Sequence, residues 1–75
     1  MNIEKESLGT IIRKKRMQLN LTQQQLADQS EITQAHISRI ESGEYTPSSV
    51  TICKLAKALD IPVIKLLEAV ERKAV

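Results

Sequence analysis

Apolar and polar residues alternate along this 75-residue chain with the spacing of α-helices. From Leu8 onward, apolar side chains recur mostly three or four positions apart, which places them on one face of a helix. Only two glycines and two prolines interrupt the pattern. It predicts a single all-α domain over residues 1–75, with helices at about 7–19, 23–29, 34–42, 48–59 and 63–72.

Polar residues that can cap a helix stand where three of these helices are expected to begin. Ser7 and Thr33 are suited to cap the first and third helices through their side-chain oxygens. Thr22, followed three positions later by Gln25, matches the capping box of the second helix. Gly43 is expected to adopt the left-handed conformation that ends the third helix.

The inner faces of the expected helices must supply an aliphatic core, because the chain has one tyrosine and neither phenylalanine nor tryptophan. The positions expected inside are Leu8, Ile12, Leu19, Leu26, Ala27, Ile32, Ile37, Ile40, Val50, Leu55 and Leu59. The single cysteine, Cys53, lies in an apolar stretch of the fourth helix and is expected to be a buried, reduced thiol.

The third expected helix has two unlike faces when its residues are placed about 100° apart. Ile37 and Ile40 lie on one face, with Glu41 at its edge. The other face, together with the first turn, carries Gln34, Ala35, Ser38, Arg39 and Ser42. A short helix with small and polar side chains outward is suited to the major groove of DNA, where glutamine pairs with adenine, arginine with guanine and an alanine methyl with thymine.

Four segments stand in a characteristic order and spacing between Leu8 and Leu67: LGTIIRKKRMQLNLTQQQLA, ITQAHISRIESG, TPSSVTICKLAKALDI and PVIKLL. Together they resemble the phage repressor and Cro family of helix-turn-helix regulators, also called the XRE family. The resemblance implies a compact five-helix, repressor-like domain whose second and third helices form the helix-turn-helix. It also implies sequence-specific binding to double-stranded DNA, with the third helix as the recognition helix.

The resemblance assigns roles to individual residues. Arg16, late in the first helix, is expected to pair with Glu41 of the third helix, which makes this arginine structural. The residues expected to contact base edges are Gln34, Ala35, Ser38 and Arg39. His36 and Ser38 have an alternative position against a phosphate or in water.

Phosphate contacts are expected to set the register of the protein on DNA. Gln23 begins the second helix, at the family position that binds the DNA backbone, and free amide groups at a helix N-terminus favour a phosphate. The other candidates are Thr33, His36, Ser42 and Thr46. Glu44 stands where a cation would help binding, and the net charge of the chain is only +2.

The fifth expected helix is apolar over more than one face. A symmetric homodimer through Ile64, Leu67 and Val70 would cover the surplus, and the alternative is an exposed, frayed helix end. Such a dimer would bind two half-sites of an inverted repeat about one DNA turn apart, roughly 34 Å. It would act by covering a promoter or by touching RNA polymerase, without a domain for a small-molecule effector.

Other functions remain open at this point. An antitoxin would bind a toxin through the fifth helix and the tail 71–75, and a controller protein of a restriction-modification system would share the DNA-binding surface. An enzyme is not expected, because the chain has one histidine, one cysteine, no glycine-rich phosphate loop and no metal-ligand spacing. We therefore expect no catalytic residue, metal or cofactor. The lack of a signal-peptide pattern and of a membrane-length apolar run favours a cytoplasmic protein.

Overall fold

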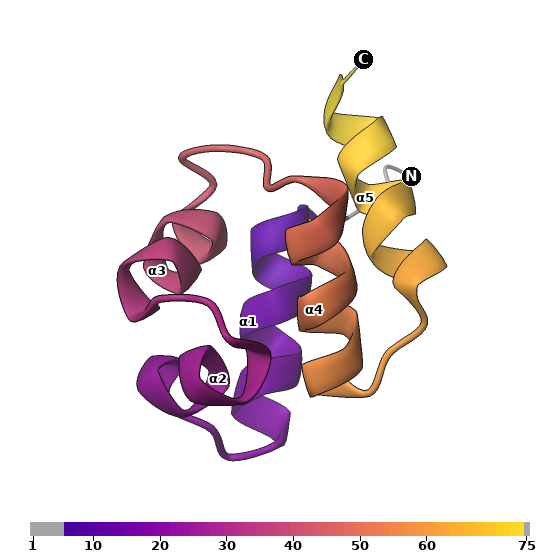
Figure 1. Cartoon of the computed structure of the whole chain (residues 1–75). Coiled ribbons are helices and arrows are strands. Elements are labelled where there is room, and N and C mark those ends of the chain that lie inside the picture. Colours follow the sequence, from indigo (N-terminus) through magenta and orange to yellow (C-terminus); the bar gives the residue numbers. More distant parts are fainter. Residues whose placement is uncertain (1–5, 75) are drawn as a thin grey trace.

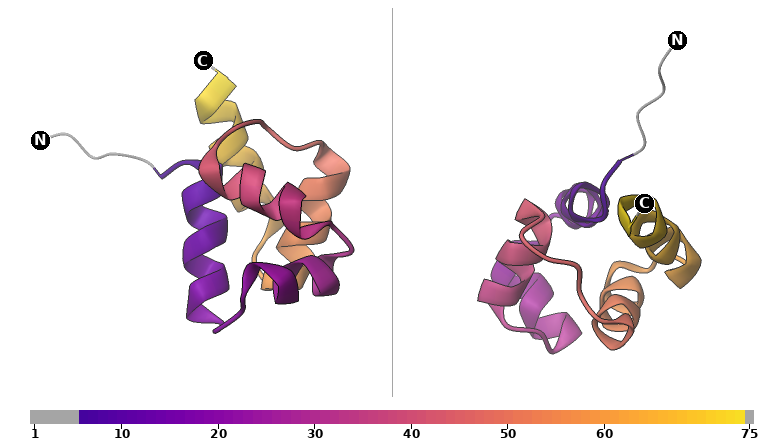
Figure 2. Two further views of the ribbon diagram at one scale, coloured as in Figure 1. Left: turned by 90° about the vertical axis from the view of Figure 1, so that its left-hand side faces the viewer. Right: turned by 90° about the horizontal axis from the view of Figure 1, so that it is seen from above.

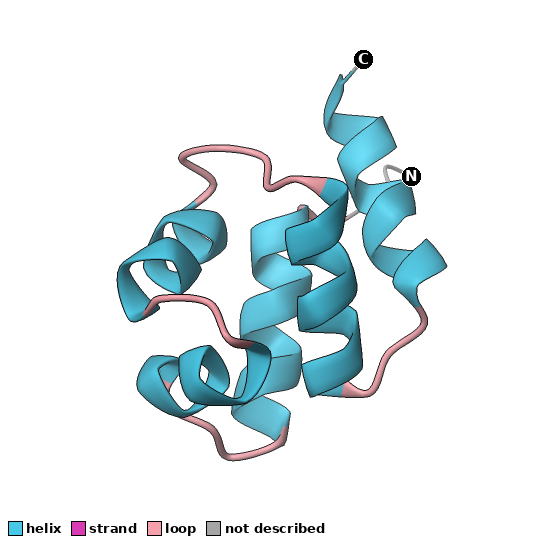
Figure 3. Ribbon diagram, in the orientation of Figure 1, coloured by secondary structure: helices cyan, strands magenta, loops and turns pink. Residues whose placement is uncertain are grey.

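Five helices make up the computed structural model, which describes residues 6–74, with side chains described as far as Val70 (Figure 1). They are α1 (Leu8–Gln18), α2 (Gln23–Ser30), α3 (Gln34–Ser42), α4 (Ser49–Leu59) and α5 (Val63–Ala74). All regular structure in the described residues is helical (Figure 3). None of these helices is both long and apolar enough to cross a membrane. Residues 1–5, expected to carry no signal peptide, lie outside the described part, as does Val75 of the tail.

The expected caps are present at the starts of the first three helices. The Thr22 hydroxyl accepts from the Gln25 amide at 3.0 Å, and the Gln25 side chain accepts from the Thr22 amide at 2.8 Å. Ser7 and Thr33 cap α1 and α3 in the same manner. Gly43 ends α3 with a φ of 82°, as its position predicts. Local side-chain chemistry therefore determines where these helices begin and end.

The helices form two groups around α1. Helices α2 and α3 lie side by side and both reach the core, with α3 packed against α1 (Figure 2). Helices α4 and α5 form an antiparallel pair on the other side, with contacts to α1. The loop after α3 arches across to the start of α4 (Figure 1). This arrangement leaves one flank of α3 facing away from the rest of the molecule.

An aliphatic core joins all five helices. Its largest fully buried side chains are Ile12, Leu26, Ile37, Ile40, Ile52, Leu55, Leu59 and Leu66. Ile32, in the turn between α2 and α3, is 9% exposed and closes the core beneath that turn, as predicted. Each of these side chains contributes about 1.5–3 kcal/mol by leaving water.

Three of the residues expected inside lie outside. Leu19 is 41% exposed, because it follows the end of α1, and the inner position one turn after Ile12 belongs to Arg16. Val50 is 64% exposed and Cys53 is also exposed. Residue 53 follows buried Ile52, so it is rotated by about 100° away from the core.

Helix α5 carries more apolar residues than the core can cover. Leu66 and Ala69 are buried, whereas Leu67 and Val70 are only partly buried against the core. Ile64 is 57% exposed. The expected surplus of apolar surface on this helix is therefore present.

Gly9 allows α1 and α3 to approach closely. A β-carbon built on Gly9 would lie 2.5 Å from the carbonyl oxygen of Ile40 and 2.6 Å from that of Glu41. Both obstacles are backbone atoms, which cannot move aside as a flexible side chain would. The absence of a side chain at this position therefore sets the distance between α1 and the end of α3.

Candidate nucleic-acid interface

Helix α3 separates its residues as the sequence predicts. Ile37 is fully buried and Ile40 is 2% exposed, which fixes the inner face of the helix in the core. The outward residues Gln34, Ala35, Ser38 and Arg39 are all exposed. Since the inner face is held by packing, the outward side chains have a defined direction relative to the domain.

An ion pair joins α1 to the end of α3. The Arg16 Nε donates to Glu41 Oε2 at 2.7 Å, and Nη2 donates to Oε1 at 3.1 Å. Arg16 Nη1 also donates to the Leu21 carbonyl at 2.8 Å, at the approach to α2. The two side chains are only 13% and 4% exposed. This two-pronged contact is the pair implied by the resemblance; it ties α3 to α1, and Arg16 also holds the segment that leads into α2.

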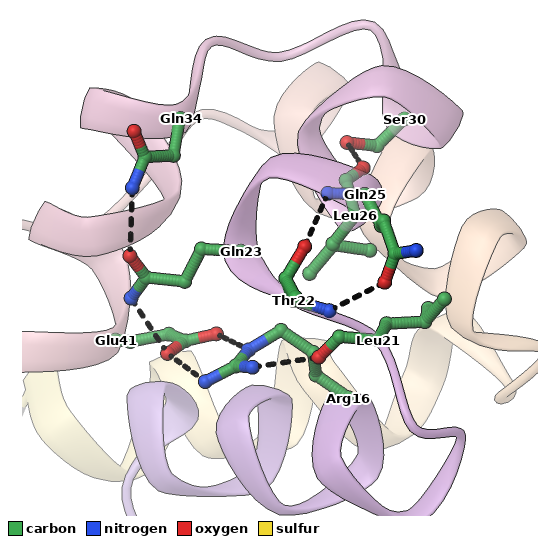
Figure 4. A network of polar contacts seen from close by, with 9 residues as sticks. All are labelled: Arg16, Leu21, Thr22, Gln23, Gln25, Leu26, Ser30, Gln34 and Glu41. Atoms are coloured by element: carbon green, nitrogen blue, oxygen red, sulfur yellow. Dashed lines mark hydrogen bonds and ion pairs between the residues drawn. The ribbon is translucent and has the colours of Figure 1, made fainter.

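Gln23 continues this contact network toward the outward face of α3 (Figure 4). Its Nε2 donates to Glu41 Oε1 at 3.1 Å, and its Oε1 accepts from Gln34 Nε2 at 3.2 Å. A glutamine amide has two N–H donors, so Gln23 keeps one for another partner. Gln23 was predicted to contact a phosphate, whereas its link to Gln34 was not predicted, because the two residues lie on different helices and meet only in the tertiary structure.

The residues expected at phosphates border the same surface. Thr33 caps α3, its hydroxyl accepting from the His36 amide at 3.2 Å. Thr46 is exposed in the loop between α3 and α4. The Ser42 hydroxyl is 3.0 Å from the Arg39 carbonyl and 3.1 Å from Glu44 Oε2. The Glu44 carboxylate therefore already occupies the Ser42 hydroxyl that was expected to bind a phosphate.

Positive charge around this surface is sparse. Arg39 is exposed and forms no ion pair with any residue that the structure describes. Lys14 on α1 forms an ion pair with Glu6. Arg13 is exposed on α1. Arg39 is thus the cation that α3 itself offers to a ligand.

Tyr45 borders the outward face of α3 from the following loop. Its ring and that of His36 are 5.2 Å apart between centroids and inclined by 34°. The two rings, with Thr33, Ala35 and Arg39, line a hollow of about 300 Å³. Tyr45 was not predicted as a contact residue of its own, although a lone aromatic residue in a loop beside the recognition helix was a usable signal.

Comparison with known proteins identifies related chains. A family model described as helix-turn-helix matches residues 12–66. The HTH-type transcriptional repressor RghR of Bacillus subtilis is 48% identical over 58 residues, which cover 76% of this chain and 43% of RghR. The chain is thus similar to a repressor more than twice as long as the matched segment.

Solved structures share the fold. The restriction-modification controller protein C.AhdI from Aeromonas hydrophila has a TM-score of 0.75 and 36% identity, over 79% of this chain and 89% of that one. The P22 c2 repressor, solved with a synthetic operator, has a TM-score of 0.80 and 28% identity, over 87% and 98%. The repressor-like, all-α fold expected from the sequence is confirmed.

Proposed function

The chain belongs to the helix-turn-helix family of DNA-binding transcriptional regulators of the phage repressor and Cro type, and we propose that it is a repressor that binds an inverted-repeat operator as a homodimer. The observation that carries this proposal is the outward face of α3, whose four exposed polar or small residues stand on a helix fixed at both ends. Fixed side chains can match base edges without a large loss of conformational entropy on binding.

The four residues have complementary chemistry toward bases. Arg39 can pair bidentately with guanine and Gln34 with adenine, while Ala35 offers a methyl group to thymine. Ser38 accepts or donates with either kind of base. The contact from Gln23 supports this assignment of Gln34, because it holds the glutamine amide in one orientation before DNA arrives.

Phosphate contacts come in this proposal from both sides of α3. Gln23 uses its remaining N–H, and the free amides at the start of α2 point the same way. Thr33, His36 and Thr46 complete the set, together with Ser42 once its hydroxyl leaves the Arg39 carbonyl and Glu44. The negative charge of Glu44 weakens the attraction of this part of the surface to phosphates. Base contacts therefore contribute a larger share of the affinity than in strongly basic domains.

Dimerisation through α5 supplies a second copy of α3 for the second half-site of the operator. Ile64, Leu67 and Val70 form the proposed seam, supported by the exposure of Ile64 and the incomplete burial of the other two. A two-fold axis would repeat the same patch on both copies and present two copies of α3 to one face of the duplex. The dimer then represses by covering a promoter.

Selection from random duplex DNA with purified protein at defined salt tests the proposal. Enrichment of an inverted repeat with half-site centres about one turn apart, roughly 34 Å, supports a dimeric reader. A promoter carrying that repeat should then lose expression in a reporter strain when the protein is supplied. Weak, salt-sensitive binding without enrichment would overturn the proposal and favour a protein partner such as a toxin.

Variants of Arg39 and Gln23 separate base reading from positioning. Arg39→Ala should relax the preference at one base pair of each half-site and cost about 1–3 kcal/mol of binding free energy. On the sequence alone, Gln23→Ala would weaken binding to all sequences alike. Its bond to Gln34 changes that expectation: the variant should also relax the base preference that depends on Gln34. Binding isotherms on single-base operator variants measure both effects, and an unchanged preference in Arg39→Ala would refute its assignment.

A further inference from the structure

We propose that the hollow beside α3 accepts the C5-methyl group of a pyrimidine, thymine or 5-methylcytosine, next to the base that Arg39 reads. Tyr45 is then a specificity-determining residue that lies outside the recognition helix. This inference rests on the proposed function, since it requires α3 to lie in the major groove.

The hollow lies on the DNA-facing side of α3 rather than in the core. Ala35 and Arg39, one turn apart on the helix, line it together with Thr33 and His36 of the first turn, and Tyr45 comes from the following loop. Its volume of about 300 Å³ exceeds that of a methyl group, so it can hold the methyl and the adjoining edge of the pyrimidine ring. The surface is therefore continuous with the four exposed reading residues.

The hollow has polar walls at Arg39 and His36 and apolar walls at Ala35 and Tyr45. The Thr33 hydroxyl is engaged as the cap of α3, accepting from the His36 amide. The Tyr45 hydroxyl is buried and has no hydrogen-bond partner among the described residues, so Tyr45 presents its ring rather than its oxygen. Ala35 adds a methyl group. The Ala35 methyl and the Tyr45 ring favour an apolar occupant on their side of the hollow, and the C5-methyl group is the apolar feature of the major groove.

Arg39 sets the position of that occupant. Arg39 lines the hollow, is exposed, and forms no ion pair with the described residues. An arginine paired with guanine O6 and N7 lies in the plane of the base, beside the neighbouring base of the stack. A methyl group on that neighbour would enter the hollow and contact Ala35 and the Tyr45 ring. Arg39 and the hollow would thus together recognise a guanine and a neighbouring pyrimidine that carries a C5-methyl group.

Removing one methyl group from DNA tests the inference. In the selected operator, each thymine is replaced in turn by deoxyuridine, which lacks only the methyl, and each cytosine by 5-methylcytosine, which gains one. We expect one position per half-site, beside the guanine that depends on Arg39, to change affinity about fourfold per methyl, as for burial of one such group. Equal affinities at every position would overturn the inference while leaving operator selection, and the proposed function, intact.

Two variants of Tyr45 test whether the whole hollow, or Ala35 alone, recognises the methyl group. Tyr45→Phe keeps the ring and removes a buried hydroxyl without a partner, so it should retain the fourfold ratio between methylated and unmethylated operators. Tyr45→Leu removes the aromatic wall and should reduce the ratio to less than twofold. The ratio compares two operators bound by the same variant, so a general loss of protein stability does not change it. Circular dichroism measures any such loss. A full fourfold ratio in Tyr45→Leu would exclude Tyr45 from methyl reading.

Discussion

The α1–α3 half and the α4–α5 half of the molecule bury similar aliphatic side chains but are held in different ways. In the first half, Arg16 and Glu41 form a nearly buried, two-pronged ion pair, and Gly9 lets two backbones approach. In the second half, no ion pair joins the described side chains of α4 and α5. Their contact rests on apolar residues such as Leu59 and Leu66.

This difference matches what each half has to do. Directed polar contacts fix the rotation of α3, whose side chains, in the proposed function, meet base edges within a few tenths of an ångström. Apolar contacts have no preferred direction and can be extended to a second surface. The exposed Ile64 on α5 offers an apolar side chain for such a contact. The α1–α3 half, held by directed polar contacts, therefore suits the reading of bases, and the α4–α5 half, held by apolar contacts, suits association with a second copy.

Breaking the Arg16–Glu41 pair should have the largest effect. Arg16→Met leaves the Glu41 carboxylate, 4% exposed, without its cationic partner and should lower the free energy of unfolding by about 3–5 kcal/mol. Urea unfolding measures this change. Lys57→Met on α4, which alters an exposed lysine with no described ion pair, should stay within about 0.5 kcal/mol and serves as the control.

A double variant sharpens this test. Arg16→Met with Glu41→Leu replaces the pair by apolar side chains and should recover most of the stability. It should not recover operator preference, because Gln23 loses the Glu41 oxygen that holds it against Gln34. A double variant with full preference would show that apolar packing suffices to orient α3. If Arg16→Met lowers the free energy of unfolding by less than about 1 kcal/mol, the ion pair does not hold the α1–α3 half together as proposed.

The close approach at Gly9 should give the second largest effect. Alanine is the better helix former by about 1 kcal/mol, so propensity alone predicts that Gly9→Ala stabilises α1. The added β-carbon would instead meet two backbone oxygens of α3, at 2.5 and 2.6 Å. We expect a net loss of about 2–3 kcal/mol in urea unfolding. Gln18→Ala, at the exposed end of the same helix, should change stability little, and a stabilised Gly9→Ala would refute the packing argument.

Sequence patterns predicted the first half of the molecule better than the second. The caps of α1, α2 and α3, buried Ile32 and the left-handed Gly43 are local features, and each is confirmed. In α4 the apolar residues are spaced so that either Val50 or Ile52 could share the buried face with Leu55 and Leu59. The choice of Val50 was wrong because the buried stripe runs through Ile52.

The candidate site could be predicted in part. The outward residues of α3 follow from helical spacing, and the Arg16–Glu41 pair from the family resemblance. The bond between Gln23 and Gln34 could not be read from spacing, because it joins side chains of two helices whose relative position depends on the whole core. The same holds for the place of Tyr45, which depends on the path of a loop.

A change on α5 should weaken association without weakening the fold. Ile64→Ala removes apolar area that is 57% exposed in one copy and would be covered in the proposed dimer. The dimer dissociation constant should rise about tenfold, or about 1.4 kcal/mol, by sedimentation equilibrium, while the unfolding of the monomer stays nearly unchanged. Lys65→Ala, at the adjacent exposed position, should leave the constant unaltered. Equal constants for the two variants would place the seam elsewhere.

The smallest expected effect compares the turns of the two halves. Glu31, between α2 and α3, and Asp60, between α4 and α5, have left-handed φ values of 61° and 56°. This conformation costs most residues about 1–2 kcal/mol, and glycine avoids that cost while losing more chain entropy on folding. Glu31→Gly should therefore raise the unfolding free energy by about 0.5–1 kcal/mol. Asp60→Gly should raise it by less, because aspartate tolerates the left-handed region better than glutamate does.

Asn20, with a φ of 59°, is the matched control for these two turns. Asparagine tolerates the left-handed region better than glutamate does, so Asn20→Gly should change stability by less than Glu31→Gly. If Glu31→Gly stabilises the protein and leaves the base preferences of Gln34 and Arg39 unaltered, the turn connects α2 and α3 without orienting the reading face. That result would assign the orientation of α3 to the Arg16–Glu41–Gln23 contacts. A changed preference would show that the turn itself takes part in positioning α3.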